Sequence, residues 1–184
     1  MLLHFQQKGI MELMIKAFIV AATTADGFIA KSADHGAYWS STDDKKRFVE
    51  LTKRAGVVVM GSTTYKTLPR PLKERVNIVY SRDKTFEGAE VTQDEPLALL
   101  QKLEARGFTE VAICGGSHTY NMFMKAGVVD TLYLTVEPLV FGQGISLFSE
   151  DMNYHLELIS HEKSELGSLM LEYKVHYQSN QSNI

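Results

Sequence analysis

The sequence predicts an α/β protein whose central sheet is mixed and mostly parallel. Apolar runs of strand length end at glycines or polar turns, and residues with helical spacing follow several of them. Near-continuous apolar character, typical of strands buried on both faces, occurs at residues 15–23, 57–60, 76–80 and 110–114. Two later runs, residues 154–161 and 168–177, flank Gly167 and therefore indicate an antiparallel pair at one end of the sheet.

The length and composition fit a single domain. The chain has 184 residues, and one domain usually has roughly 100–200. We place the domain at residues 14–178, because the first strong strand pattern begins at Ile15. Residues 1–13 are expected to be an N-terminal extension, or to reflect the choice of start codon, and residues 179–184 to be a polar tail.

Charge and cysteine content exclude several classes of function. A formal net charge of −3 gives no basic footprint for nucleic acid or for an anionic membrane. No apolar run approaches the roughly 18 residues of a membrane span. The single cysteine, Cys114, excludes an internal disulfide and fits a reducing cytoplasm. The six histidines lack metal-ligand spacing, so no metal site is expected.

The first strand, residues 15–23, leads to the turn signal Asp26-Gly27 and a brief apolar segment. Residues 31–38 are polar and are expected to form an exposed loop, which Trp39, the only tryptophan, closes.

A helix is expected to begin at Ser41, because Ser41 and Asp44 have the spacing of a capping box. Phe48, Leu51 and Thr52 then lie on one face of it. Two interpretations of Asp44 remain open at this point. It either stabilises the start of the helix through the helix dipole or serves as a functional carboxylate.

The second strand, residues 57–60, ends at Gly61, and a short helix follows from Ser62-Thr63-Thr64. A basic loop, residues 70–75, precedes the third strand, which ends at Ser81-Arg82. A helix is expected from residue 95 to about residue 106, where Gly107 ends it.

Residues 113–120, Ile-Cys-Gly-Gly-Ser-His-Thr-Tyr, join the fourth strand to another helix. Glycine is needed where the backbone turns sharply or approaches a ligand closely, and a helix N-terminus offers unpaired N–H groups to a phosphate. The alternative is a tight turn with Ser117 as N-cap. Residues 131–137 are expected to be a strand and residues 138–144 a glycine-punctuated loop.

Together these motifs resemble dihydrofolate reductase, in order and spacing, from about Met14 to Thr135. The segments concerned are Val20-Ala-Ala, Asp26 with Ile29-Ala, Trp39 with Asp44, Phe48 and Thr52, Val59-Met-Gly with Thr64-Tyr, Arg70-Pro-Leu with Arg75-Val-Asn-Ile-Val, Gly115-Gly-Ser-His-Thr-Tyr120 and Leu132-Tyr-Leu-Thr135. The resemblance implies a three-layer α/β/α fold around the mixed sheet.

Other segments resemble a sister family, the reductase domain of the bifunctional riboflavin-biosynthesis deaminase/reductase (the RibD C-terminal domain). They are Asp26-Gly-Phe-Ile-Ala, Tyr38-Trp-Ser and Pro138-Leu-Val-Phe-Gly-Gln-Gly144. The sequence contains no zinc-deaminase signature, so a stand-alone reductase is implied. The chain departs from dihydrofolate reductase at Lys45 and Ser62, which replace an apolar and a basic residue. It departs from the riboflavin reductase at Thr67-Leu-Pro69, which replaces Asp-Asp-Pro.

The resemblance implies hydride transfer from NADPH to a heterocyclic small molecule. It favours a riboflavin precursor, as in a 5-amino-6-(5-phosphoribosylamino)uracil reductase. The alternative substrate is dihydrofolate or another pteridine. It implies Asp44 and Thr135 as catalytic residues, and Trp39, Phe48, Arg70 and Arg75 as substrate-binding residues. The implied cofactor-binding residues are Ala22, Ile29, Gly61, Ser62, Thr63, Thr64, Ser81, Arg82, Cys114, Gly115, Gly116, Ser117, His118, Thr119 and Tyr120.

Two further expectations concern function and assembly. The alternative to an enzyme is a non-catalytic protein that binds NADPH. Such a protein would bind the cofactor but would not oxidise it with any substrate. A homodimer is expected, because the riboflavin-type relatives commonly pair and the late strands carry alternating apolar residues such as Leu156 and Leu158.

Overall fold

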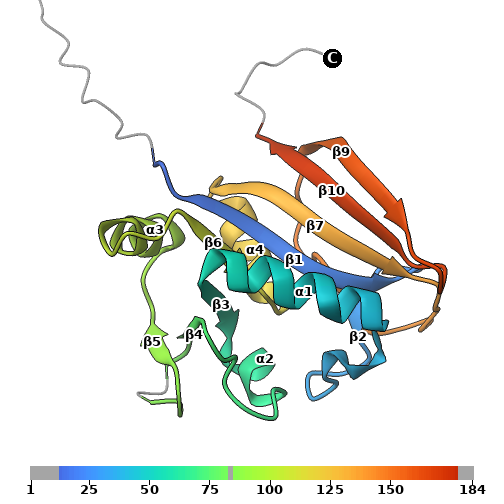
Figure 1. Cartoon of the computed structure of the whole chain (residues 1–184), viewed down its shortest axis with the longest axis horizontal. Coiled ribbons are helices and arrows are strands. Elements are labelled where there is room, and N and C mark those ends of the chain that lie inside the picture. The colour runs from blue at the N-terminus through green and yellow to red at the C-terminus, as the bar shows by residue number, and fades with distance from the viewer. Residues whose placement is uncertain (1–12, 83–84, 178–184) are drawn as a thin grey trace, which may run out of the picture.

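The computed structural model describes residues 13–82 and 85–177 (Figure 1). Within this part of the chain, eight strands form one sheet in the order β5-β4-β3-β6-β1-β7-β10-β9. The strands are β1 (Lys16–Thr24), β3 (Val57–Gly61), β4 (Val76–Tyr80), β5 (Glu90–Thr92), β6 (Glu110–Ile113), β7 (Val129–Glu137), β9 (His155–Lys163) and β10 (Leu169–His176). Residues 1–12 of the expected extension and the expected tail lie outside the described residues.

The sheet is mixed and mostly parallel, as the sequence predicted. Neighbouring strands from β5 to β7 pair in parallel, and β10 joins β7 in antiparallel register. Strand β9 pairs antiparallel with β10 and forms the edge, which confirms the predicted late hairpin. Strand β7 begins at Val129, two residues before the expected start. A second, two-stranded sheet of β2 (Phe28–Ala30) and β8 (Ile145–Ser146) was not predicted, because such short strands show no periodicity.

The helices are α1 (Thr42–Ala55), α2 (Ser62–Lys66), α3 (Pro96–Ala105) and α4 (Ser117–Lys125), with a 3-10 turn η1 (Ala37–Trp39). Helix α1 begins where the capping pattern predicted, since the Ser41 hydroxyl accepts the backbone N–H of Asp44 at 3.1 Å. It ends at Gly56, whose φ of +70° is the left-handed conformation that glycine adopts readily.

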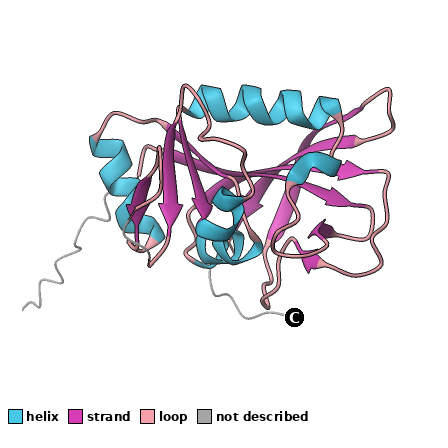
Figure 2. Ribbon diagram, turned by 90° about the horizontal axis from the view of Figure 1, so that it is seen from below, coloured by secondary structure: helices cyan, strands magenta, loops and turns pink. Residues whose placement is uncertain are grey.

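Helices cover both faces of the sheet, which gives the expected three layers (Figure 2). Alternate residues of β1 point to opposite faces. Ile19 packs in the same cluster as Leu100 of α3 and Phe123 of α4, whereas Phe18 packs in the cluster that contains Leu51 of α1. Burial on both faces explains why β1 has a continuous apolar sequence.

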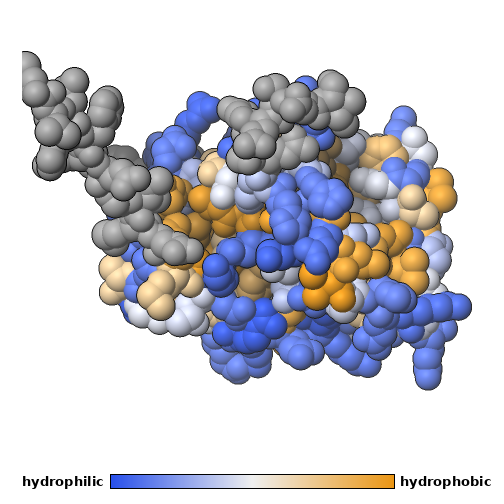
Figure 3. Space-filling view, turned by 90° about the horizontal axis from the view of Figure 1, so that it is seen from above, coloured by the Kyte–Doolittle hydropathy of each residue, from blue (hydrophilic) through white to orange (hydrophobic). Residues whose placement is uncertain are grey.

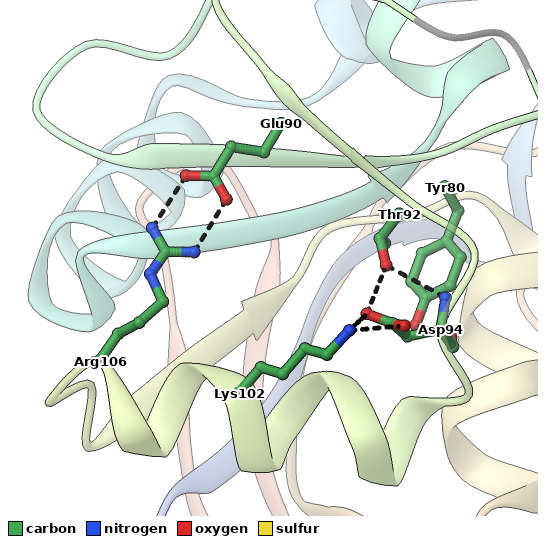
Figure 4. Close-up of polar contacts among 6 residues, drawn as sticks. All are labelled: Tyr80, Glu90, Thr92, Asp94, Lys102 and Arg106. Carbon is green, nitrogen blue, oxygen red and sulfur yellow. Dashed lines mark hydrogen bonds and ion pairs between the residues drawn. The ribbon is translucent and has the colours of Figure 1, made fainter.

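Strand β5 forms the edge of the sheet opposite to β9, and charged pairs connect it and the segment after it to α3 (Figure 4). The guanidinium of Arg106 donates both hydrogen bonds at 2.8 Å to the carboxylate of Glu90 on β5. Asp94 pairs with Lys102 at 2.8 Å, and its carbonyl oxygen accepts the hydroxyl of Tyr80 at 2.9 Å. These contacts hold the end of β4 in place beside the functional site.

Candidate functional site

A cavity of about 680 Å³ lies at the carboxyl ends of β1, β3, β4 and β6. Its walls include Ala22 after the middle of β1, Gly61 at the end of β3, Tyr80 at the end of β4 and Cys114 directly after β6. Parallel α/β sheets bind ligands outside these strand ends, and most small-molecule sites have volumes of roughly 300–1,000 Å³.

One side of the cavity is built from glycine backbone. Gly61 donates its N–H to the carbonyl oxygen of Gly115 at 2.7 Å, so the ends of β3 and β6 lie in contact. The peptide between Gly115 and Gly116 is cis. A Cβ atom added to Gly116 would lie 3.2 Å from the Thr64 hydroxyl, and one added to Gly61 would lie 3.1 Å from the Thr119 hydroxyl. Side chains at these positions would fill the space next to the N-termini of α2 and α4.

The other side of the cavity contains a buried carboxyl group. Asp44, in the first turn of α1, is 8 % exposed, and the hydroxyl groups of Ser40 and Thr135 lie close enough to its carboxyl group to influence its pKa. Burial raises the pKa of Asp44 above its ordinary value, and the negative charge of Glu137 contributes to the rise. The two hydroxyl groups and the positive charge of Arg47 act in the opposite direction. The site therefore offers an acid that keeps its proton to higher pH than an exposed aspartate.

Aromatic rings from the segment before α1 and from the loop after β7 meet beside the cavity. Phe141, in the loop after β7, contacts the rings of Trp39 and His35 at centroid distances of 5.2 and 5.7 Å. Both Trp39 and His35 line the cavity. Within residues 13–82 and 85–177, Nε1 of Trp39 is the buried side-chain nitrogen without a hydrogen-bond partner.

Most of the residues singled out in the sequence line this one cavity. The catalytic candidate Asp44 lines it together with the substrate-binding candidates Trp39 and Phe48. The lining cofactor-binding candidates are Ala22, Ile29, Gly61, Ser62, Thr63, Thr64, Cys114, Gly115, Gly116, Ser117, His118, Thr119 and Tyr120. Thr135 stands behind Asp44, close to its carboxyl group, rather than in the wall.

Four basic or polar candidates do not line the cavity: Arg70, Arg75, Ser81 and Arg82. The Arg75 side chain donates instead to the Thr52 hydroxyl at 2.8 Å and to the Lys73 carbonyl oxygen at 2.8 Å. The expected anion clamp at Arg70 and Arg75 is therefore not part of the wall. Arg82 follows Tyr80, which does line the cavity, by two residues.

Sequence reasoning missed several wall residues. Tyr80 was assigned only to a strand, yet its position at a strand end was a usable signal. Lys45 was noted only as a departure from a family pattern. Its ammonium group donates to the carbonyl oxygens of Tyr38 and Ser40 at 3.0 and 2.9 Å, which fixes the loop before α1. Glu137 does not line the cavity, but its charge acts on Asp44; it carried no sequence signal, because this effect depends on contacts across the fold.

The part of the chain that the structure describes lacks two kinds of feature. It contains no group of three or more His, Cys, Asp or Glu side chains placed to hold a metal ion. Among the same residues, no helix has both the length and the apolar character required to cross a membrane.

The fold and the site together define an α/β protein with one cavity lined both by the glycine-rich start of α4 and by a buried acid. The chain belongs to the dihydrofolate reductase family, whose model matches residues 16–168. It is 29% identical over 154 residues to the uncharacterized protein YwjB of Bacillus subtilis, covering 75% of this chain and 85% of that protein.

Two more similarities extend this result. The dihydrofolate reductase of Haemophilus influenzae is 31% identical over 117 residues, which cover 64% of this chain and 69% of that enzyme. A crystal structure of a putative riboflavin biosynthesis protein from Shewanella sp. PV-4 superposes with a TM-score of 0.74 and 22% identity. The match covers 89% of this chain and 100% of that one, and it shows the shared fold.

Proposed function

We propose that this protein is an NADPH-dependent reductase that transfers hydride to a heteroaromatic substrate of the riboflavin-precursor type, such as 5-amino-6-(5-phosphoribosylamino)uracil. One observation carries the proposal: a single cavity joins the glycine-lined N-terminus of α4 to the buried carboxyl group of Asp44. This arrangement suits a phosphate-bearing cofactor at one end and a reacting ring that needs a proton at the other.

The residues present fit the cofactor. Gly61, Gly115 and Gly116 leave open the space that Cβ atoms would occupy, and the start of α4 provides N–H groups for a pyrophosphate. When bound, NADPH supplies the hydride. Ser62, Thr63 and Thr64 at the start of α2 would contact its phosphates. Ser81 and Arg82, just beyond the cavity wall, would reach its 2′-phosphate.

Asp44 would hold a proton beside the substrate ring, and Thr135 would orient its carboxyl group. Trp39 and Phe48, which both line the cavity, would pack against the ring. Lys45 is the lysine in the wall, next to Asp44, and it offers a cation for the sugar phosphate of a riboflavin precursor.

A dihydrofolate or pteridine reductase is the second candidate. The identity of 31% to the Haemophilus influenzae enzyme favours it, as does the carboxyl group at Asp44. The structural similarity to a riboflavin biosynthesis protein along its whole length supports the first candidate.

The proposal includes the setting in which the protein acts. Residues 14–178 would form the reductase domain of a cytoplasmic homodimer. Support for the dimer comes from β9, an edge strand whose Leu158 and Ile159 are 50% and 52% exposed. Hydrophobic residues also reach the surface among hydrophilic ones in Figure 3.

The decisive test is NADPH oxidation by the purified protein with 5-amino-6-(5-phosphoribosylamino)uracil and, separately, with dihydrofolate. Turnover of the first and not the second is the expected result. Turnover of dihydrofolate alone would select the second candidate. Tight NADPH binding without oxidation in either assay would indicate a non-catalytic binding protein.

A further inference from the structure

Glu137 is a buried carboxylate two residues after Thr135 on β7, and it lies next to Asp44. It is 3% exposed. Because alternate strand residues share a face, Thr135 and Glu137 both point from β7 toward the start of α1. Thr135 contacts Asp44. Glu137 contacts Ser41, which precedes Asp44 by three residues.

Glu137 connects three elements of the fold. One carboxylate oxygen accepts the backbone N–H of Ser41, the N-cap residue of α1, at 2.8 Å. The other accepts the hydroxyl of Ser168, directly before β10, at 2.5 Å. Ser168 is fully buried, and its backbone N–H and carbonyl group bond to Ser164 across the β9–β10 turn. The first turn of α1 is thus tied to the end of β7 and to the late hairpin.

We propose that Glu137 is a positioning residue, which fixes the first turn of α1 and thereby holds the carboxyl group of Asp44 against Thr135. The inference rests on the proposed function, in which Asp44 delivers the proton. A buried carboxylate that loses one of its donors costs free energy, so Glu137 holds the Ser41 backbone in place. Because Asp44 lies in the first turn after Ser41, this restraint limits the movement of Asp44 as well.

Glu137 also acts on Asp44 through its charge. The charges of Glu137 from β7 and Arg47 from α1 change the pKa of Asp44. The charge of Asp44 in turn contributes to the raised pKa of Tyr120 from α4. The Arg47 guanidinium, fixed by hydrogen bonds to the Leu134 and Leu171 carbonyl oxygens, favours the ionised form of Asp44. Glu137 opposes it and favours the protonated form.

Two substitutions separate position from charge. Glu137→Gln keeps an oxygen for the Ser41 N–H and an amide group that can donate to Ser168, but it removes the charge. Glu137→Ala removes both the contacts and the charge. The matched control is Glu157→Gln, which removes one negative charge from an exposed pair with His176 on the late hairpin.

The readouts are the pH titration of the Asp44 side-chain carboxyl carbon by NMR and the turnover rate on its pH-independent plateau. We expect Glu137→Gln to move the Asp44 midpoint to lower pH while it retains most of the plateau rate. Glu137→Ala should lower that rate about 10- to 100-fold with little change in KM, because a misplaced catalytic group costs rate rather than binding. Glu157→Gln should match the wild type.

A wild-type plateau rate in folded Glu137→Ala would overturn the positioning role. An Asp44 midpoint unchanged in Glu137→Gln would overturn the effect of the Glu137 charge on Asp44. If the alanine variant does not fold, Ser168→Ala, which removes one of the two donors that hold Glu137, takes its place in the plateau-rate measurement, and a wild-type rate would again overturn the positioning role. The titration requires no turnover, so a protein that reduces neither substrate would refute the proposed function without refuting the coupling between Glu137 and Asp44.

Discussion

The carboxylate of Asp26 accepts the backbone N–H of Gly142 at 2.7 Å and so joins the turn after β1 to the loop after β7. The same carboxylate accepts the N–H of Phe141 at 3.2 Å and the hydroxyl of Thr24 at 2.5 Å. These donors lower the pKa of Asp26. Because the Phe141 ring contacts Trp39, which lines the cavity, the position of this loop affects the cavity wall.

Asp26→Ala should release the loop and change the fluorescence of Trp39, the only tryptophan. In the wild type the same change should appear in acid, since the contact is present above the unfolded pKa of Asp26 and is lost as pH falls through the lower, folded value. Asp34→Ala is the control, because the Asp34 carboxylate binds Ser32 in the neighbouring loop and its pKa is also lowered. Equal emission spectra for wild type and Asp26→Ala would contradict the prediction.

Asp44→Asn should lower the turnover rate by about 10²- to 10⁴-fold, because the proton donor is lost, and should retain NADPH binding. It should also stabilise the protein at neutral pH. The folded pKa of Asp44 is raised, so ionisation costs stability above that value and costs nothing below the unfolded pKa. Urea unfolding as a function of pH tests this. The gain should shrink as the pH falls toward the unfolded pKa, and a variant less stable than the wild type at neutral pH would contradict it.

Gly115→Ala should impair both folding and cofactor binding. Its φ of +116° is unfavourable for alanine, and the added Cβ would lie 3.2 Å from the Tyr120 hydroxyl. The strain corresponds to about 1–3 kcal/mol of unfolding free energy. Gly127→Ala is the matched control, with φ of +70° and nothing within 4 Å of the added atom. Thermal unfolding and NADPH titration should show a smaller stability loss and normal binding for the control.

NADPH should bind more tightly than NADH, and Arg82→Ala should remove the difference. A guanidinium–phosphate hydrogen bond contributes roughly 1.5–3 kcal/mol, about tenfold or more in affinity. Arg70→Ala, a second exposed arginine outside the cavity wall, should leave both affinities unchanged. Quenching of Trp39 fluorescence gives both dissociation constants. Equal constants in the wild type would rule out a 2′-phosphate site at Arg82.

Light scattering at micromolar concentration should give a mass of about twice the chain mass of 20.7 kDa. Ile159→Lys places a charge on the exposed side of the edge strand and should yield monomers. Leu97→Lys, on the exposed face of α3, is the control and should remain dimeric. A monomeric wild type would also favour the dihydrofolate candidate.

The sequence by itself determined most strands of the main sheet, though not the short edge strand β5, and the glycine side of the cavity. Continuous apolar runs predicted strands such as β1 and β3, because burial on both faces leaves no polar position. The Gly115-Gly116 turn was visible for a similar reason, since close backbone approach requires glycine whatever surrounds it. These features depend on local backbone and burial, which neighbouring residues encode.

Only the tertiary structure decided which charged groups act on the site. The family resemblance implied that Arg75 binds an anionic group of the substrate. In the structure its guanidinium donates to the Thr52 hydroxyl and to the Lys73 carbonyl oxygen. Glu137 had no motif, yet it binds Ser41, 96 positions away along the chain, beside Asp44. Long side chains can point in several directions from one backbone position, and their partners come from distant segments. Contacts of this kind follow from how the layers pack, and no local pattern records them.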